Sequence, residues 1–212
     1  TKPAGWIRLR NATQRNPDTA AQLDIWNAEL STQRADAQTP ELRAFVAKNR
    51  NLIAAEYHAP TEEGFAIELA RHRDTTGVID TAPEFGANGR EIWVRYLFPP
   101  DPDTYPEGFE YVMFGRAIGG QVLKAEVVAA APKPQYLSAP EDYEYVPLEQ
   151  IDEEVDPTPQ PPHLDDDVES VARLYLQSAA PVTFLMAVYT TRDTAAPLQA
   201  ARTAVEEAER IG

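Results

Sequence analysis

Two adjacent glycines, Gly119-Gly120, divide the most strongly patterned stretch of this chain, residues 109–128. The run FEYVMFGRAI precedes them and the run QVLKAEVV follows, and both are rich in β-forming residues. Glycine accepts a positive φ at the centre of a tight turn because it has no Cβ. The pattern predicts a β-hairpin over 109–128, whose two-residue loop would place Ile118 opposite Gln121.

This register predicts one apolar face and one mixed face for the hairpin. Val112 and Phe114 lie on the apolar face, and the charges of Lys124 and Glu126 lie on the other. Such a division is typical of an antiparallel sheet that is covered on one side. Arg116 falls on the apolar face, so its guanidinium either extends to the sheet edge or binds a carboxylate of a partner or of this chain. Arg116 is therefore a candidate binding residue.

Neighbouring segments extend the hairpin into an antiparallel meander. Residues 91–98 alternate apolar and polar side chains and end at Pro99-Pro100, which predicts a strand. Residues 64–73 fit either a strand or a helix, and we favour the strand because a turn sequence follows. Trp93 and Tyr105 belong to an aromatic group that either packs in the core or forms a ligand platform, so both are candidate binding residues.

The segments before and after the meander predict helices. Residues 18–33 and 40–57 have apolar side chains at helical spacing, which predicts an N-terminal helical hairpin. A C-terminal α-β-α tail is expected from a helix over 168–177, a buried strand over 181–189 and a helix over 197–210. The predicted fold class is α+β: a meander packed against helices from both ends of the chain.

We expect a single domain over 1–212 with two less regular parts. Residues 1–16 are predicted to be a flexible lead-in or, through Trp6–Leu9, an edge strand. Residues 132–162 are acidic and rich in proline, so they cannot build a core and must form an arm or a linker. Tyr143 and Tyr145 are candidate binding anchors within that arm.

The formal net charge of −15 excludes some classes of partner. Nucleic acids and anionic membrane surfaces are disfavoured, whereas a basic protein is a suitable partner. The chain has no cysteine and no apolar run long enough to span a bilayer. Because it begins at Thr1, an upstream leader or anchor would fit, and we slightly favour an exported or periplasmic protein over a cytoplasmic one.

No motif in the sequence identifies an active site. His58, Glu68 and His72 resemble a set of metal ligands only if residues 64–73 are helical, so no metal or cofactor is predicted. The acidic run Asp165–Asp167 fits helix capping better than calcium binding. No serine lies in a glycine elbow, and no phosphate-binding loop occurs.

These observations favour a non-enzymatic protein that serves as an interaction or structural subunit of a larger assembly. A metal-assisted or carboxylate-based hydrolase is the first alternative. A glycan or small-ligand binding domain that uses the aromatic side chains of the meander is the second.

Overall fold

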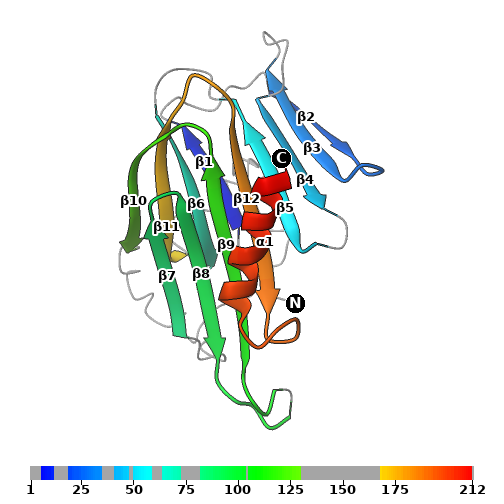
Figure 1. Ribbon diagram of the computed structural model, residues 1–212, viewed down its shortest axis with the longest axis vertical. Coiled ribbons are helices and arrows are strands. Elements are labelled where there is room, and N and C mark those ends of the chain that lie inside the picture. Colours follow the sequence, from blue (N-terminus) through cyan, green and yellow to red (C-terminus); the bar gives the residue numbers. More distant parts are fainter. Residues whose placement is uncertain are drawn as a thin grey trace, which may run out of the picture.

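A computed structural model describes residues 6–11, 19–34, 41–47, 50–58, 64–72, 82–103, 105–129 and 168–211. These residues form strands and a C-terminal helix (Figure 1). The elements are β1 (Trp6–Asn11), β2 (Thr19–Asp24), β3 (Glu29–Arg34), β4 (Leu42–Ala47), β5 (Leu52–Tyr57), β6 (Phe65–His72), β7 (Ala82–Asn88), β8 (Glu91–Phe98), β9 (Phe109–Ile118), β10 (Gln121–Ala129), β11 (Val168–Gln177), β12 (Val182–Thr190) and α1 (Pro197–Ile211).

The strands form two antiparallel sheets of unequal size. The smaller sheet has the order β1-β6-β11-β10, and the larger has the order β2-β3-β4-β5-β12-β9-β8-β7. The main core lies between the two sheets and includes Phe65 and Leu174 from the smaller sheet and Tyr96, Met113 and Phe184 from the larger. The protein is therefore nearly all-β, and the predicted α+β class is wrong.

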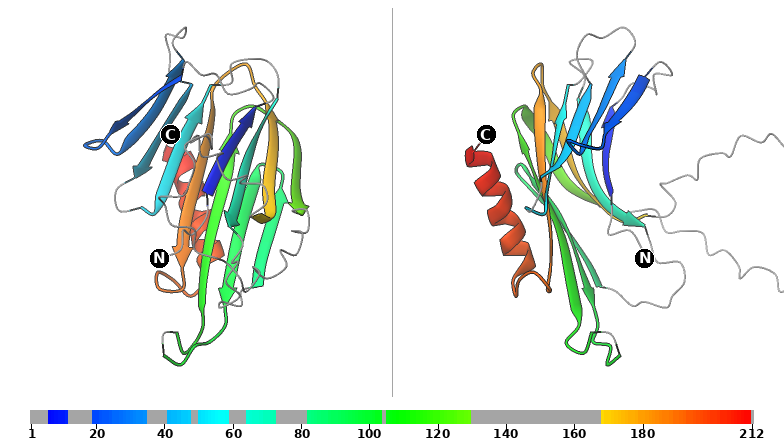
Figure 2. Two further views of the ribbon diagram at one scale, coloured as in Figure 1. Left: turned by 180° about the vertical axis from the view of Figure 1, so that it is seen from behind. Right: turned by 90° about the vertical axis from the view of Figure 1, so that its right-hand side faces the viewer.

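Helix α1 covers the opposite face of the larger sheet, over β9 and β12 (Figure 2). Ala201 and Val205 of the helix pack on Phe114 and Leu185 of these strands. Because β9 and β12 are covered on both faces, both must be apolar on both faces. This explains the unbroken apolar run that predicted a buried strand over 181–189, and β12 confirms that prediction.

Both strands predicted around Gly119-Gly120 exist, but they do not pair with each other. Strand β9 pairs with β8 and β12, whereas β10 pairs with β11 in the other sheet, so Ile118 lies opposite Thr183 and not Gln121. A hairpin would have placed Lys124 and Glu126 on the core face of β9. Crossing to the smaller sheet allows both charged side chains to remain outside the core.

The glycines are required by this crossing between the sheets. Gly119 and Gly120 have φ values of 84° and 61°, in the left-handed region. A Cβ on Gly120 would lie 3.0 Å from the Cγ2 atom of Val182 and 3.2 Å from the Cβ atom of Ser178. Ser178 lies in the connection from β11 to β12, which crosses between the same two sheets, and Val182 is the first residue of β12. The two connections therefore lie in contact.

The predicted N-terminal helical hairpin is absent, because residues 18–33 and 40–57 contain two strand pairs. β2 pairs with β3, and β4 pairs with β5, which continues the sheet through its pairing with β12. Asn51 has a φ of 48° in the turn before β5, which interrupts the helical pattern. Pairing with neighbouring strands outweighed the modest helix preference of this alanine-rich sequence.

The C-terminal tail is β-β-α and not α-β-α. Residues 168–177 form β11, in which Ala172, Leu174 and Leu176 face the core while Arg173 points outward. This alternation is a strand signal that the helical interpretation missed. Strands are confirmed for 64–73 by β6 and for 91–98 by β8, Trp6–Leu9 lies in the edge strand β1, and α1 confirms the last helix. Residues 132–162 lie outside the described parts of the chain.

Candidate functional site: an uncovered wing of the larger sheet

Strands β2, β3 and β4 extend the larger sheet beyond the area that the smaller sheet covers (Figures 1 and 2). We call these three strands the wing. The core face of the larger sheet continues into the wing, because Val46 lies opposite Ile53 and Ala44 lies opposite Ala55 in the register of β4 and β5. Within the described ranges, the wing is thus an extension of a two-layer sandwich in which Leu42 of β4 still packs against the core between the sheets and the more distant residues do not.

The core-side face of the wing is mostly apolar, and strand alternation places one charged residue on it, Arg34 at the end of β3. Leu23 and Val46 remain 65% and 56% exposed on this face, and Leu30 lies between them. In a chain with 25% charged residues, an exposed area of apolar and hydroxyl side chains is the kind of patch that marks an interaction site. We call it the uncharged face; its residues are Ala21, Leu23, Leu30, Thr32, Leu42, Ala44 and Val46.

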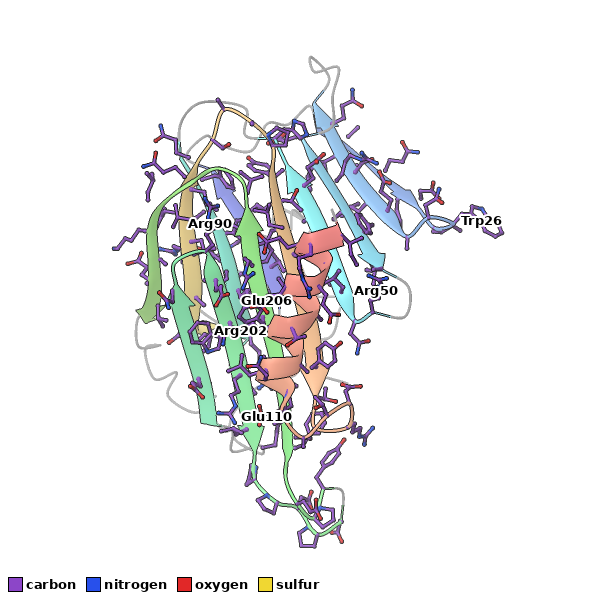
Figure 3. All side chains as sticks on the ribbon, viewed as in Figure 1. Trp26, Arg50, Arg90, Glu110, Arg202 and Glu206 are labelled. Atoms are coloured by element: carbon purple, nitrogen blue, oxygen red, sulfur yellow. The ribbon has the colours of Figure 1, made fainter. Side chains whose placement is uncertain are left out.

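The turn between β2 and β3 carries an exposed tryptophan at the tip of the wing. Trp26 is 93% exposed and points away from the sheet (Figure 3). The Asp24 carboxylate accepts hydrogen bonds from the Trp26 amide at 2.9 Å and from the Asn27 amide at 3.1 Å. It also accepts one from the Asn27 side chain at 2.7 Å, and these bonds, led by that of the Asn27 side chain, lower the pKa of Asp24. A defined turn therefore presents the indole.

The opposite face of the wing combines an aromatic residue with an ion pair. Phe45 is half-exposed on this face. Beside it, two nitrogens of Arg43 donate to the Glu29 carboxylate at 3.0 and 3.2 Å, and this hydrogen-bonded pair raises the pKa of Arg43. The charges of this pair offset each other at the surface of the wing.

The outer edge of the wing, β2, lacks the devices that usually block edge-to-edge pairing. Edge strand β7 contains Pro83, edge strand β10 has a register shift between Val122 and Lys124, and edge strand β1 carries Arg8. The sequence of β2, TAAQLD, contains no proline and no basic residue, and its ladder has no bulge. Of the four sheet edges in the described structure, β2 is the one most open to an additional strand.

Arg116 lies at the centre of an ion network that joins the larger sheet to α1. Its guanidinium donates to Glu91 of β8, to Glu206 at 3.1 Å and to Glu209 at 2.8 Å. Arg202 completes the network with a bond of 3.3 Å to Glu91. Burial opposes the charge of Arg116, but the hydrogen bonds outweigh it and raise its pKa. The carboxylates that Arg116 contacts come from this chain.

Trp93 and Tyr105 lie far apart and in different surroundings. The Trp93 indole packs directly on Gly86, where an added Cβ would meet the ring at 1.8 Å, and its Nε1 atom is buried without a hydrogen-bond partner in the described chain. The Tyr105 hydroxyl accepts a hydrogen bond from Arg192 at 3.1 Å. Tyr143 and Tyr145 lie outside the described residues.

The aromatic residues of the meander are mostly inside the molecule. Tyr96 is 1% exposed, and Tyr111 and Phe114 are also buried. They therefore pack in the core instead of forming a platform for a sugar. Within the described ranges, no three histidine or acidic side chains are arranged to hold a metal ion. In the same ranges, no helix is long and apolar enough to cross a bilayer.

Glu68 occupies a charged row across the outer face of the smaller sheet. It is fully buried, and Arg8 and Arg173 donate to its two carboxylate oxygens at 2.6 Å. The strand register aligns Arg8, Glu68 and Arg173 side by side. Burial opposes the charge of Arg173, but Glu68 outweighs it and raises the pKa of that guanidinium. The row joins three strands and accounts for Glu68 as an ion-pair partner.

A shallow groove lies beside α1. It has a volume of about 240 Å³ and lies between the C-terminal half of the helix and the start of β5. Its lining combines Arg50 and Glu207 with Leu52, Tyr189 and Ile211. The groove contains no histidine, serine or paired acid that would suggest chemistry.

No family model matches the chain, and no curated protein or solved structure is significantly similar to it. The function must therefore be inferred from the wing and its surroundings alone.

Proposed function

We propose that this chain is a non-enzymatic subunit of a larger assembly and that it binds another protein through the wing. The observation that carries the proposal is the uncharged face, which, among the described residues, lacks the second layer that covers the rest of the same sheet. A partner that packs on it would remove Leu23, Leu30 and Val46 from water.

The tip of the wing supports this proposal. Tryptophan is among the residues most enriched at the energetic centres of protein interfaces. Trp26 and its neighbour Ile25 are both exposed, although exposing them is unfavourable for the isolated chain. The turn that holds Trp26 is fixed by three hydrogen bonds to Asp24, so little conformational freedom is lost on binding.

The charge of the chain favours a different, basic protein over a second copy. Two copies with a formal net charge of −15 each would repel one another as they approach. A basic partner would instead be attracted over long range, and the uncharged face would then provide the close contact. The partner would either pack on that face or add a strand to the β2 edge.

The proposal is tested by placing a photo-crosslinking amino acid at Leu23, Trp26 or Val46 of the full chain in its own cells. Each position should yield the same discrete adduct with another protein. Leu123 of β10 is the matched control, because it is an exposed leucine on the smaller sheet and should not yield that adduct.

Two results would overturn the proposal. One is a lack of adducts at all three wing positions, and the other is an adduct pattern that is the same at Leu123. Sedimentation of the purified chain over a range of concentrations tests the choice of partner. We expect a monomer, and a dimer that the Trp26→Ala substitution dissociates would identify a second copy as the occupant. Deleting residues 132–162 should leave the wing adduct in place.

A further inference from the structure

Arg71 is a buried arginine without an acidic partner in the described chain. It is 5% exposed and lies at the end of β6 with its side chain toward the core between the sheets. Its guanidinium carbon lies 4.4 Å from the ring centroid of Tyr96, 5.5 Å from that of Phe98 and 5.9 Å from that of Tyr111. Among the described residues, no side chain or backbone carbonyl accepts a hydrogen bond from it.

Five other partly buried arginines in the described structure are each paired with a glutamate. A guanidinium that is withdrawn from water requires such a partner, because its charge and its five N–H donors are otherwise left unsatisfied. The chain contains 34 acidic residues against 19 basic ones, so acids are plentiful. The pairs are Arg8–Glu68, Arg95–Glu110, Arg116–Glu91, Arg173–Glu68 and Arg202–Glu91.

The aromatic rings stabilise the positive charge of Arg71 but accept none of the hydrogen bonds that its N–H groups can donate in the plane of the guanidinium. A guanidinium that lies over a ring interacts through its face, and the N–H groups around its edge remain available. That edge matches the two oxygens of a carboxylate, which can accept two parallel hydrogen bonds in the same plane. The arrangement around Arg71 is therefore half of an ion-binding site.

A series of adjacent aromatic rings extends from Arg71 toward the surface. Tyr96 stacks on Tyr111 at 5.2 Å, Phe98 lies 5.9 Å from Phe109, and Phe109 stacks on Tyr105 at 5.0 Å between ring centroids. Along this series the rings change from buried at Tyr96 to partly exposed at Phe98 and beyond. A ligand that approaches along the partly exposed rings would meet apolar walls before it reaches the guanidinium.

We propose that Arg71 and the rings of Tyr96, Phe98 and Tyr111 form a binding site for a small monocarboxylate with an apolar or aromatic body. The guanidinium binds the carboxylate and the partly exposed Phe98 ring contacts the body, while the buried rings of Tyr96 and Tyr111 hold the guanidinium in place. A phosphate would be a poorer ligand, because its higher charge is costlier to transfer from water and is repelled more strongly by an acidic protein.

Calorimetric titration of the full chain with benzoate tests this site. Benzamide is the neutral ligand of nearly the same shape, and inorganic phosphate is the competing anion. We expect one benzoate per chain, no measurable binding of benzamide, and weaker binding of phosphate than of benzoate.

Variants of the arginine test the site from the protein side. Arg71→Lys keeps a charge over the rings but lacks the planar edge, so benzoate affinity should fall roughly tenfold or more, and Arg71→Met should abolish binding. Arg192→Gln is the matched control, because Arg192 also lies over a tyrosine ring, at 5.2 Å from Tyr105, but at an exposed position. It should bind benzoate like the unmodified chain.

Circular dichroism identifies variants that have failed to fold, and if Arg71→Met is unfolded, the Arg71→Lys result decides. Three results would each overturn the proposal. These are a failure of benzoate to bind the unmodified chain, phosphate binding that is as tight as benzoate binding, and an affinity that Arg71→Lys leaves unchanged.

Discussion

The wing and the covered part of the larger sheet differ in what lies on their faces and not in how their strands are built. Both are antiparallel ladders of apolar and polar residues, and they meet without a break at β4 and β5. From β5 to β7 the sheet has the smaller sheet on one face, and over β9 and β12 it has α1 on the other. Among the described residues, the wing has neither layer beyond β4, where Leu42 and Ala47 still touch the two core clusters.

Two pairs of residues of the same type, one in each region, illustrate this difference. Phe184 of β12 is 2% exposed and Phe45 of β4 is 48% exposed, although both are phenylalanines in the same sheet. Arg116 lies under α1 with three glutamates, whereas Arg43 has a single glutamate partner at the surface. Burial and ion pairing are therefore concentrated in the covered region, and we expect that region to contribute more to stability than the wing.

The largest expected effect comes from truncating Phe184. Phe184→Ala should lower the free energy of unfolding by about 3–5 kcal/mol, because it leaves a cavity between the two sheets where the ring packs against Gly115. Phe45→Ala should lower it by about 1 kcal/mol or less, since its ring is already half in water. Urea unfolding followed by circular dichroism measures both, and equal losses would contradict the distinction between the two regions.

The next effect is expected at the ion network under α1. Arg116→Gln should cost about 1–3 kcal/mol, because it leaves Glu91 partly buried with fewer partners and loosens the helix. Arg43→Gln should leave the unfolding transition unchanged within error, because its pair with Glu29 is solvated. Hydrogen exchange of the α1 amides should rise in the first variant alone, and a rise in both would contradict a local anchoring role.

Substitution of Gly120 tests whether close contact between the two connections that cross between the sheets adds to stability beyond the effect of backbone conformation. Gly120→Ala should cost about 1–2 kcal/mol, from its left-handed φ and the 3.0 Å approach to Val182. Gly89→Ala is the control, because Gly89 has a similar φ of 57° but open space around the added Cβ. Thermal unfolding should show a smaller loss for Gly89→Ala, and the reverse order would remove the argument from close packing.

The smallest effect is a local one at the tip of the wing. Because the pKa of Asp24 is lowered in the folded protein, its hydrogen bonds to the turn persist above the ordinary carboxyl value of 3.8 and are lost as the pH falls through the lower folded value. The fluorescence anisotropy of Trp26, measured with Trp6 and Trp93 replaced by phenylalanine, should therefore fall only below pH 3.8. Asp24→Asn should remove this pH dependence, and a fall that begins above pH 3.8 in the parent would contradict it.

Local sequence patterns predicted the strands that are bounded by proline or glycine. Pro99-Pro100 ends β8, Gly119-Gly120 separates β9 from β10, and Pro181 precedes β12. Helix α1 was also predictable, since its small apolar residues recur at helical spacing and Pro197 begins it. Where alanine-rich strands followed one another with short turns, as in β4 and β5, the same residues fitted a helix and the prediction was wrong.

The candidate site was harder to predict than the strands. Trp26 was assigned to a helix, so its exposure at a turn was missed, although Asp24 and Asn27 in the sequence DIWNA are typical turn residues and carried a usable signal. The sequence indicates Arg116 as a residue that simple packing does not explain, and the structure pairs it with glutamates of the same chain. Arg71 was not indicated in this way, because nothing in the sequence shows that a guanidinium near the end of a strand lies over aromatic rings and away from every described acid.

The sequence by itself determined the acidic charge, the positions of the clearest strands and the need for glycine at residues 119 and 120. Only the tertiary structure decided that β9 and β10 belong to different sheets and that β2–β4 remain uncovered. The physical reason is that alternation along a strand specifies which side chains share a face but not which strand pairs with it or what covers that face. Those choices depend on contacts between residues distant in sequence, such as Phe184 with Gly115, and in the wing such contacts are missing from the described structure.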